Sequence, residues 1–148
     1  MRILQKNNAV YGGTNKPGVL ISCVANFDSA RVEIYIDQGD YDKNRAVYRL
    51  LETHRSEIET AYGKALTWVC QEGVRGCRIY DKMTEVSITK EDDWDAMIAF
   101  HTQQAKKLLS AMQSVLDLVF LTVESEKELS EAGRKTYGSK CESQQSKS

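Results

Sequence analysis

The stretch from Glu91 to Val123 most constrains the fold, because its apolar residues recur at a spacing that a helix satisfies. Three acidic residues at its start, with Thr89 before them as N-cap, suit the positive end of a helix dipole. The apolar seam advances in steps of four and three through Trp94, Ile98, His101, Ala105, Leu108, Met112, Val115 and Val119. The pattern predicts a long helix with one buried face.

Such a helix would run to about 50 Å at 1.5 Å per residue, which exceeds the width of a compact domain of this size. We therefore expect part of it to meet another helix, another subunit or a neighbouring domain. The prediction is a homo-oligomer formed through this C-terminal helix. Its expected interface residues are Ile98, His101, Leu108, Met112, Val115 and Val119.

Two hairpins are predicted before that helix. The β-rich run 19–27 is followed by a turn at Asp28-Ser29 and by the alternating segment 30–37. A second pair, 66–72 and 77–83, is separated by two glycines, and 84–89 is a candidate extra strand. Between the hairpins, apolar positions at helical spacing predict a helix over 42–62 that ends at Gly63.

The expected fold class is α+β: an antiparallel sheet of two hairpins with a packed helix after each (ββαββα), the last helix being the long one. Residues 1–18, which hold Asn, Gly and the only Pro, are expected to form an N-terminal loop. Residues 19–123 are expected to form a single domain. Residues 124–148 have few apolar side chains and are expected to form a disordered polar tail.

The charge balance excludes a strong global field, because 20 Lys and Arg stand against 21 Asp and Glu. Nucleic-acid binding would then need a local basic patch. The first residues, MRILQKNNAV, lack the apolar run of a signal peptide, and we expect no stretch to approach the roughly 20 apolar residues of a membrane span. The expected location is the cytoplasm, with no membrane contact.

Enzymatic signals are weak, so we expect a non-enzymatic protein without metal or cofactor. The four cysteines contain no CxxC pair, and Cys23, Cys70 and Cys77 are expected to be core thiols. No lysine has an acidic residue two positions before it, as a restriction-type nuclease site usually has. His54 and His101 are expected to be structural, and there is no P-loop and no GxGxxG.

The remaining candidate site is the polar side of a predicted strand. Alternation puts Ala30, Val32, Ile34 and Ile36 on a core face and the residues between them on the other. Alternation also puts Arg78 and Tyr80 on one face of the segment 77–83. If the two segments are neighbours, two arginines and two tyrosines together would suit a phosphate or a base, since Arg presents a planar fork and Tyr a stacking ring. The alternative is a solvated ladder of Arg–Glu pairs worth a few tenths of a kcal/mol each. The candidate ligand-binding residues are Arg31, Glu33, Tyr35, Asp37, Arg78 and Tyr80.

Several passages in order resemble the bacterial domain-of-unknown-function family 4268: RVEIYIDQGD, then Asn44, EIETAYGKALTW, CRIYD and EDDWDAMIAF. The resemblance covers about residues 19–119. Matching residues are Arg31, Glu33, Asn44, Ile58, Glu59, Gly63, Trp68, Arg78, Ile79 and Trp94. Members of that family often follow regions that resemble restriction nucleases, so the resemblance implies a context of nucleic-acid processing or phage defence.

Three functional hypotheses follow. The first is a non-catalytic accessory module of a restriction or phage-defence system that binds nucleic acid or a nuclease partner. The second is a self-associating inhibitor or small-ligand-binding protein of the anti-defence type. The third is a structural domain that dimerises a larger enzyme.

Overall fold

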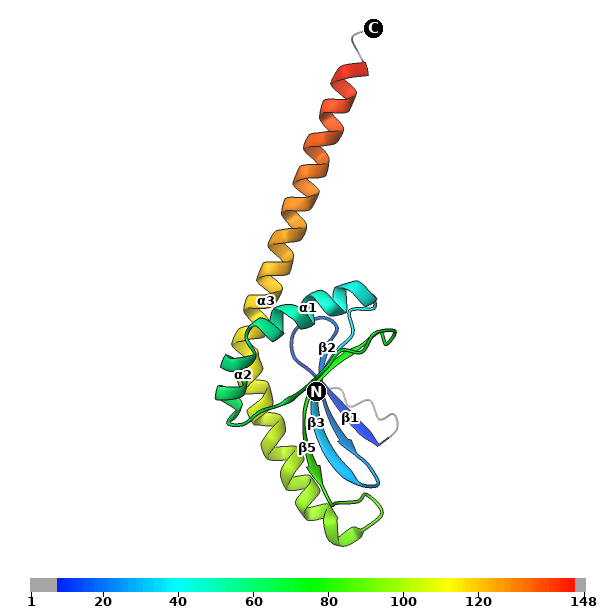
Figure 1. Cartoon of the computed structure of the whole chain (residues 1–148), viewed down its shortest axis with the longest axis vertical. Coiled ribbons are helices and arrows are strands. Elements are labelled where there is room, and N and C mark those ends of the chain that lie inside the picture. Colours follow the sequence, from blue (N-terminus) through cyan, green and yellow to red (C-terminus); the bar gives the residue numbers. More distant parts are fainter. Residues whose placement is uncertain (1–7, 146–148) are drawn as a thin grey trace.

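The computed structural model describes residues 8–145, with side chains described up to residue 135. In chain order its elements are β1 (Ala9–Gly13), β2 (Val19–Ala25), β3 (Ser29–Ile36), α1 (Tyr41–Thr53), α2 (Arg55–Tyr62), β4 (Thr67–Val69), β5 (Cys77–Thr84), the 3-10 turn η1 (Glu91–Asp93) and α3 (Trp94–Gln145). The strands form one antiparallel sheet in the order β1-β2-β3-β5-β4 (Figure 1). The α+β class and the long C-terminal helix are confirmed, whereas the ββαββα order is wrong.

The extra strand β1 lies within the expected N-terminal loop. Its register runs from Ala9 opposite Val24 to Gly13 opposite Leu20. Local propensity is low there, but the backbone of β1 completes the hydrogen bonding of the free edge of β2, so pairing overrides propensity. The β2–β3 hairpin itself is confirmed, with Val19 opposite Ile36 and Ala25 opposite Ala30.

The single helix expected over 42–62 is two helices that meet at His54. The Thr53 hydroxyl donates to the Leu50 carbonyl at 2.6 Å, and the His54 backbone N–H donates to Leu51 at 2.9 Å, so the last turn of α1 tightens. At the start of α1, the Asp40 carboxylate accepts from the Lys43 backbone N–H at 2.9 Å. Gly63 ends α2 in a left-handed conformation with φ of 102°, as expected.

The second hairpin, β4–β5, is confirmed, but β5 also pairs with β3 along its whole length. The strand expected over 84–89 is absent from the described residues apart from Thr84, which ends β5. Glu85 has φ of 61°, which breaks the extended backbone. The N-cap assignment to Thr89 is also wrong: Lys90 caps η1 without a side-chain bond, and the Asp93 carboxylate accepts from the Ser87 backbone N–H at 2.9 Å.

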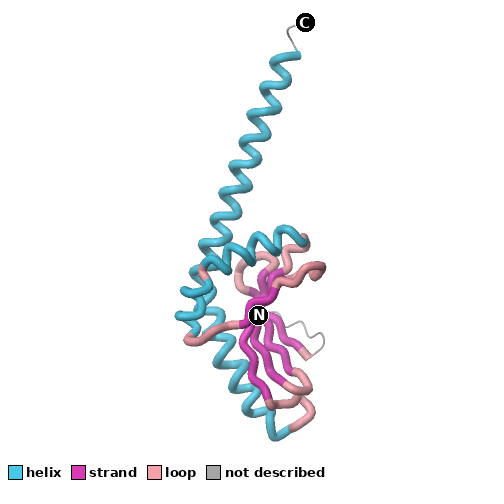
Figure 2. Tube along the Cα trace, in the orientation of Figure 1, coloured by secondary structure: helices cyan, strands magenta, loops and turns pink. Residues whose placement is uncertain are grey.

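The hydrophobic core lies between one face of the sheet and the helices. Figure 2 shows the helices gathered along one side of the strands, with α3 continuing beyond them. The predicted core face of β3 is confirmed, because Ala30, Val32, Ile34 and Ile36 are fully buried. Apolar residues of all three helices pack against that face, including Val47, Leu51, Ile58, Leu108, Met112, Val115 and Val119.

Helix α3 extends well past the sheet (Figure 1). It continues to Gln145, so the structure places in a helix most of the segment for which composition predicts a disordered tail. Residues 146–148 of that segment lie outside the described residues. Contrary to the expectation that no stretch approaches a membrane span, α3 is long and apolar enough to cross one by length and composition. That is weak evidence, because the core helix of a soluble protein meets the same criterion.

The expectation that Cys70 and Cys77 are core thiols is wrong, since the two form a disulfide across the β4–β5 hairpin. Cross-strand pairing brings their Cα atoms to 4.5 Å, within the range that a disulfide spans. The two cysteines are seven positions apart in the sequence, so no CxxC spacing indicates the bridge. Cys23 is a half-buried free thiol, and burial raises its pKa. The side chain of Cys141 lies outside the described part.

Candidate functional site

The candidate site is the face of the sheet that the described helices leave uncovered, which we call the open face. Residues directly opposite one another on paired strands point to the same face. Three cross-strand pairs of β3 and β5 point to the open face: Arg31 with Lys82, Glu33 with Tyr80, and Tyr35 with Arg78. The structure therefore brings together five of the six predicted ligand-binding residues and adds Lys82, which is exposed.

Glu33 lies at the centre of this face, between two arginines. Its carboxylate is 2.8 Å from Nε of Arg31 and 3.7 Å from Nε of Arg78. The residue is only 4% exposed. A carboxylate this buried is costly unless it is paired, and the two guanidinium groups provide the pairing. Glu33 therefore sets where both arginine side chains lie.

Each arginine also lies beside a tyrosine ring. The guanidinium carbon of Arg31 is 5.1 Å from the ring centroid of Tyr80, and that of Arg78 is 5.1 Å from the centroid of Tyr35. Cation–π contacts at such exposed sites contribute about 0.5–1 kcal/mol. Arg31, Glu33, Tyr35, Arg78 and Tyr80 thus form one connected group, here called the arginine–tyrosine cluster. The cluster contains the ion pairs Arg31–Glu33 and Arg78–Glu33. Ion pairs of this kind are also what the alternative hypothesis, a solvated ladder of Arg–Glu pairs, expects.

The ring of Tyr35 is further held by Gly76, which precedes β5. A Cβ atom at position 76 would lie 2.6 Å from the Tyr35 hydroxyl oxygen and 2.7 Å from its Cε2. A larger residue at position 76 would therefore push the end of the Tyr35 ring out of its place. Sequence reasoning treated Gly76 only as a turn residue.

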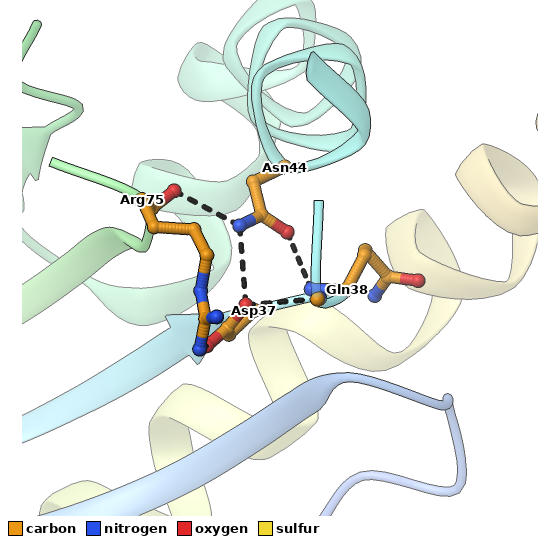
Figure 3. Close-up of polar contacts among 5 residues, drawn as sticks. Asp37, Gln38, Asn44 and Arg75 are labelled. Atoms are coloured by element: carbon orange, nitrogen blue, oxygen red, sulfur yellow. Dashed lines mark hydrogen bonds and ion pairs between the residues drawn. The ribbon is translucent and has the colours of Figure 1, made fainter. Parts of the chain in front are cut away.

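The sixth predicted residue, Asp37, belongs to a separate group at the end of the sheet (Figure 3). Its carboxylate pairs with the Arg75 guanidinium at 2.6 Å and accepts from the Gly39 backbone N–H at 2.9 Å and the Asn44 amide at 3.3 Å. Burial raises the pKa of Asp37, but these hydrogen bonds and the charge of Arg75 outweigh it and lower that pKa. Asp37 therefore connects the β3–α1 loop, through Gly39, with the β4–β5 loop, through Arg75.

Asn44 is the centre of that second group and is fully buried in the first turn of α1. Its amide donates to the Arg75 carbonyl at 2.9 Å, and its side-chain oxygen accepts from the Gln38 backbone N–H. The side chain therefore joins α1 to the β3–α1 and β4–β5 loops, as Figure 3 shows. Sequence reasoning reached Asn44 only through the family resemblance, since an isolated Asn at a helix start has no signal of its own.

The residues expected at an oligomer interface divide between the surface and the core. Leu108, Met112, Val115 and Val119 are at most 2% exposed and pack inside this chain, so their assignment to a contact between subunits needs correction. Only Ile98 of the set is widely exposed, at 61%. The apolar face of α3 packs against the sheet of the same chain. Helical periodicity shows that this face is buried but does not show what covers it.

His101, the sixth residue of that set, is half-buried. Its Nε2 lies 3.1 Å from the Val24 carbonyl oxygen, and burial lowers its pKa. Beside it is an apolar cavity of about 220 Å³, below the usual 300–1,000 Å³ of small-molecule sites. The cavity is lined by Ala25, Ile88, Trp94, Met97, Ile98 and His101. Within the described part of the chain, no three His, Cys, Asp or Glu side chains gather as metal ligands.

Comparison with known proteins identifies a family. A family model described as "Domain of unknown function (DUF4268)" matches residues 5–116, which is more than half of the chain. No curated protein and no solved structure matches the sequence.

Proposed function

The chain belongs to the family of the domain of unknown function DUF4268, and on that premise we propose that it is a non-catalytic accessory module whose open face binds nucleic acid. The setting we propose is a restriction or phage-defence system, which rests on the family resemblance. The observation that carries the binding proposal is the charge of the open face. Among the described strand residues of that face, Arg31, Arg78 and Lys82 stand against the single carboxylate of Glu33, in a chain whose net charge is −1.

The arginines suit a phosphate backbone because of how Glu33 holds them. The Nε atoms of Arg31 and Arg78 lie 2.8 Å and 3.7 Å from the Glu33 carboxylate. The planar fork of an arginine carries further N–H donors, which match the geometry of a phosphate. The side chains of Arg31 and Arg78 keep 27% and 41% of their surface exposed. Lys82 lies two residues from Tyr80 along β5, on the same face, and adds a third cation. Neutralising several phosphates in this way produces salt-dependent affinity.

The test is fluorescence anisotropy of labelled oligonucleotides between about 50 and 200 mM salt. Replacing Arg31 and Arg78 together by Ala should weaken binding and lower the slope of log affinity against log salt by about 2. The matched control replaces Arg49 and Arg134, both exposed and away from the open face, and should change the affinity much less.

Loss of both arginines leaves Glu33 buried without a partner, so the double variant also needs a folding check by circular dichroism. Lys82→Ala removes a cation that holds no described ion pair with Glu33 and should still reduce the salt slope by about 1. Unchanged binding by folded protein in both variants would refute the open face as the site. Absence of any nucleic-acid binding by the unaltered chain would leave a nuclease partner as the ligand to test.

Self-association through α3 is the second candidate, and the observation that favours it is a set of exposed leucines. Leu118, Leu121 and Leu129 are 50%, 62% and 74% exposed along α3. This candidate covers both a self-associating inhibitor and a domain that dimerises a larger enzyme. Light scattering coupled to size exclusion should give a multiple of the chain mass, reduced by Leu121→Glu with Leu129→Glu but not by the control Ser130→Glu. A monomer at all concentrations would end this candidate.

A further inference from the structure

We propose that the ligand of the open face is an unpaired nucleic-acid strand, whose bases stack on tyrosines of the sheet. This inference rests on the proposed function and narrows it. The sheet presents its aromatic rings on the same face as its cations, and a paired duplex cannot use the rings.

The tyrosines are placed by the register of four neighbouring strands. Tyr11 of β1 lies opposite Ser22 of β2, Ser22 lies opposite Glu33 of β3, and Glu33 lies opposite Tyr80 of β5. Tyr11 and Tyr80 are therefore in one row across the open face. Tyr35 lies two residues along β3 from Glu33, and all three tyrosines are partly exposed.

The spacing of the rings suits separate bases. Tyr35 and Tyr80 are diagonal neighbours on adjacent strands, roughly 7–8 Å apart at the backbone. Tyr11 and Tyr80 are three strand spacings apart, which is about 14 Å. Aromatic rings at separate positions on a sheet stack successive bases of a single strand, and every base has a face that stacks. Each exposed ring therefore adds to the affinity for an unpaired strand.

The arginine–tyrosine cluster supports the same ligand. Guanidinium planes also stack on bases, and both arginines lie against tyrosine rings. The two guanidinium groups neutralise the buried Glu33 carboxylate, the one acidic group among the described strand residues of this face. Glu33 acts in this proposal as a positioning residue for Arg31 and Arg78.

A duplex fits this face poorly for two reasons. Its bases are stacked on one another, so their faces are closed to tyrosine. Its major groove is about 12 Å wide and admits one helix or two strands, whereas five strands side by side span about 19 Å. Duplex DNA would meet the open face only through phosphates, and the tyrosines would then contribute little.

The experiment measures affinity for a labelled single strand of about 12 nucleotides and for the blunt duplex of the same sequence, using the full chain at one salt concentration. We expect the single strand to bind at least about tenfold more tightly. Replacing Tyr35 and Tyr80 together by Leu should reduce single-strand affinity by about tenfold or more and leave duplex affinity unchanged. Replacing both by Phe keeps the rings and should retain the affinity.

Tyr41→Leu is the matched control, because Tyr41 is on α1 and 37% exposed. Thermal melting of each variant separates a lost ring from a lost fold. The single variants Tyr35→Leu and Tyr80→Leu, each expected to weaken single-strand binding, carry the test if the double Leu variant does not fold. Equal binding of single strand and duplex, or full affinity in the folded Leu variant, would overturn the single-strand inference while the arginine variants still test nucleic-acid binding. Binding of neither probe would reject both proposals.

Discussion

Asn44 and Arg75 are 31 residues apart in the chain, yet the Asn44 amide donates to the Arg75 carbonyl at 2.9 Å. The other end of the same side chain accepts from the Gln38 backbone N–H. One fully buried amide thus satisfies backbone groups of two loops that would otherwise lose their solvent partners.

Replacing Asn44 by Leu should lower the free energy of unfolding by about 1–3 kcal/mol for each buried group left without a partner. Urea unfolding followed by circular dichroism measures the change. Lys43→Ala is the control, because its side chain is exposed and the neighbouring cap uses only its backbone N–H. Equal stability of the two variants would show that the Asn44 contacts contribute little.

Tyr62 provides a test of pH dependence. Its hydroxyl donates to the Asp81 carboxylate at 2.5 Å, and burial, this hydrogen bond and the charge of Asp81 raise its pKa. A raised pKa in the folded state contributes stability that is present below the pKa of the unfolded chain, about 10, and is lost as pH rises beyond it. Tyr62→Phe should cost about 1–3 kcal/mol at pH 7.

The difference between the unaltered chain and Tyr62→Phe should shrink as the pH is raised from about 10, because only the tyrosine of the unfolded chain ionises there. Urea midpoints measured in steps from neutral to alkaline pH give this difference directly. Tyr11→Phe, at a half-buried position on β1, serves as the control. If the difference in stability between Tyr62→Phe and the unaltered chain stays constant with pH, that result would contradict the raised pKa of Tyr62.

Leu108 and Ile98 lie on the same helix but differ in burial, at 0% and 61% exposure. Leu108→Ala should therefore destabilise the chain by about 2–5 kcal/mol through the cavity it leaves. Ile98→Ala should stay within about 0.5 kcal/mol of the unaltered chain. Urea unfolding distinguishes them. Similar losses at both sites would mean that α3 packs differently from the structure described above.

The Cys70–Cys77 disulfide closes a short loop of the β4–β5 hairpin. For a loop of this length the entropy removed from the unfolded chain corresponds to about 2–3 kcal/mol. Reductant should lower the free energy of unfolding by that amount. Cys23→Ser should keep the full response, and Cys70→Ser with Cys77→Ala should abolish it. A stability that ignores reductant in the unaltered chain would argue against the bridge.

Local patterns predicted much of the fold because they depend on near neighbours along the chain. The alternation of residues 30–37 identified β3 and assigned Glu33 and Tyr35 to one face, and the spacing after Glu91 identified the long helix. The same alternation in β5 placed Arg78 and Tyr80 together. Most of the arginine–tyrosine cluster was therefore predictable as two separate sets of residues.

The sequence by itself determined which segments alternate, which turn and which side of each strand is polar. Only the tertiary structure decided that β3 and β5 are neighbours, that β1 extends the sheet, and that Asn44 and the Cys70–Cys77 bridge fasten its end. It also decided that Leu108 faces its own sheet instead of a partner. The reason is physical: periodicity reports the environment of a residue, whereas pairing between distant segments depends on backbone hydrogen bonds and packing that many sequences satisfy equally well.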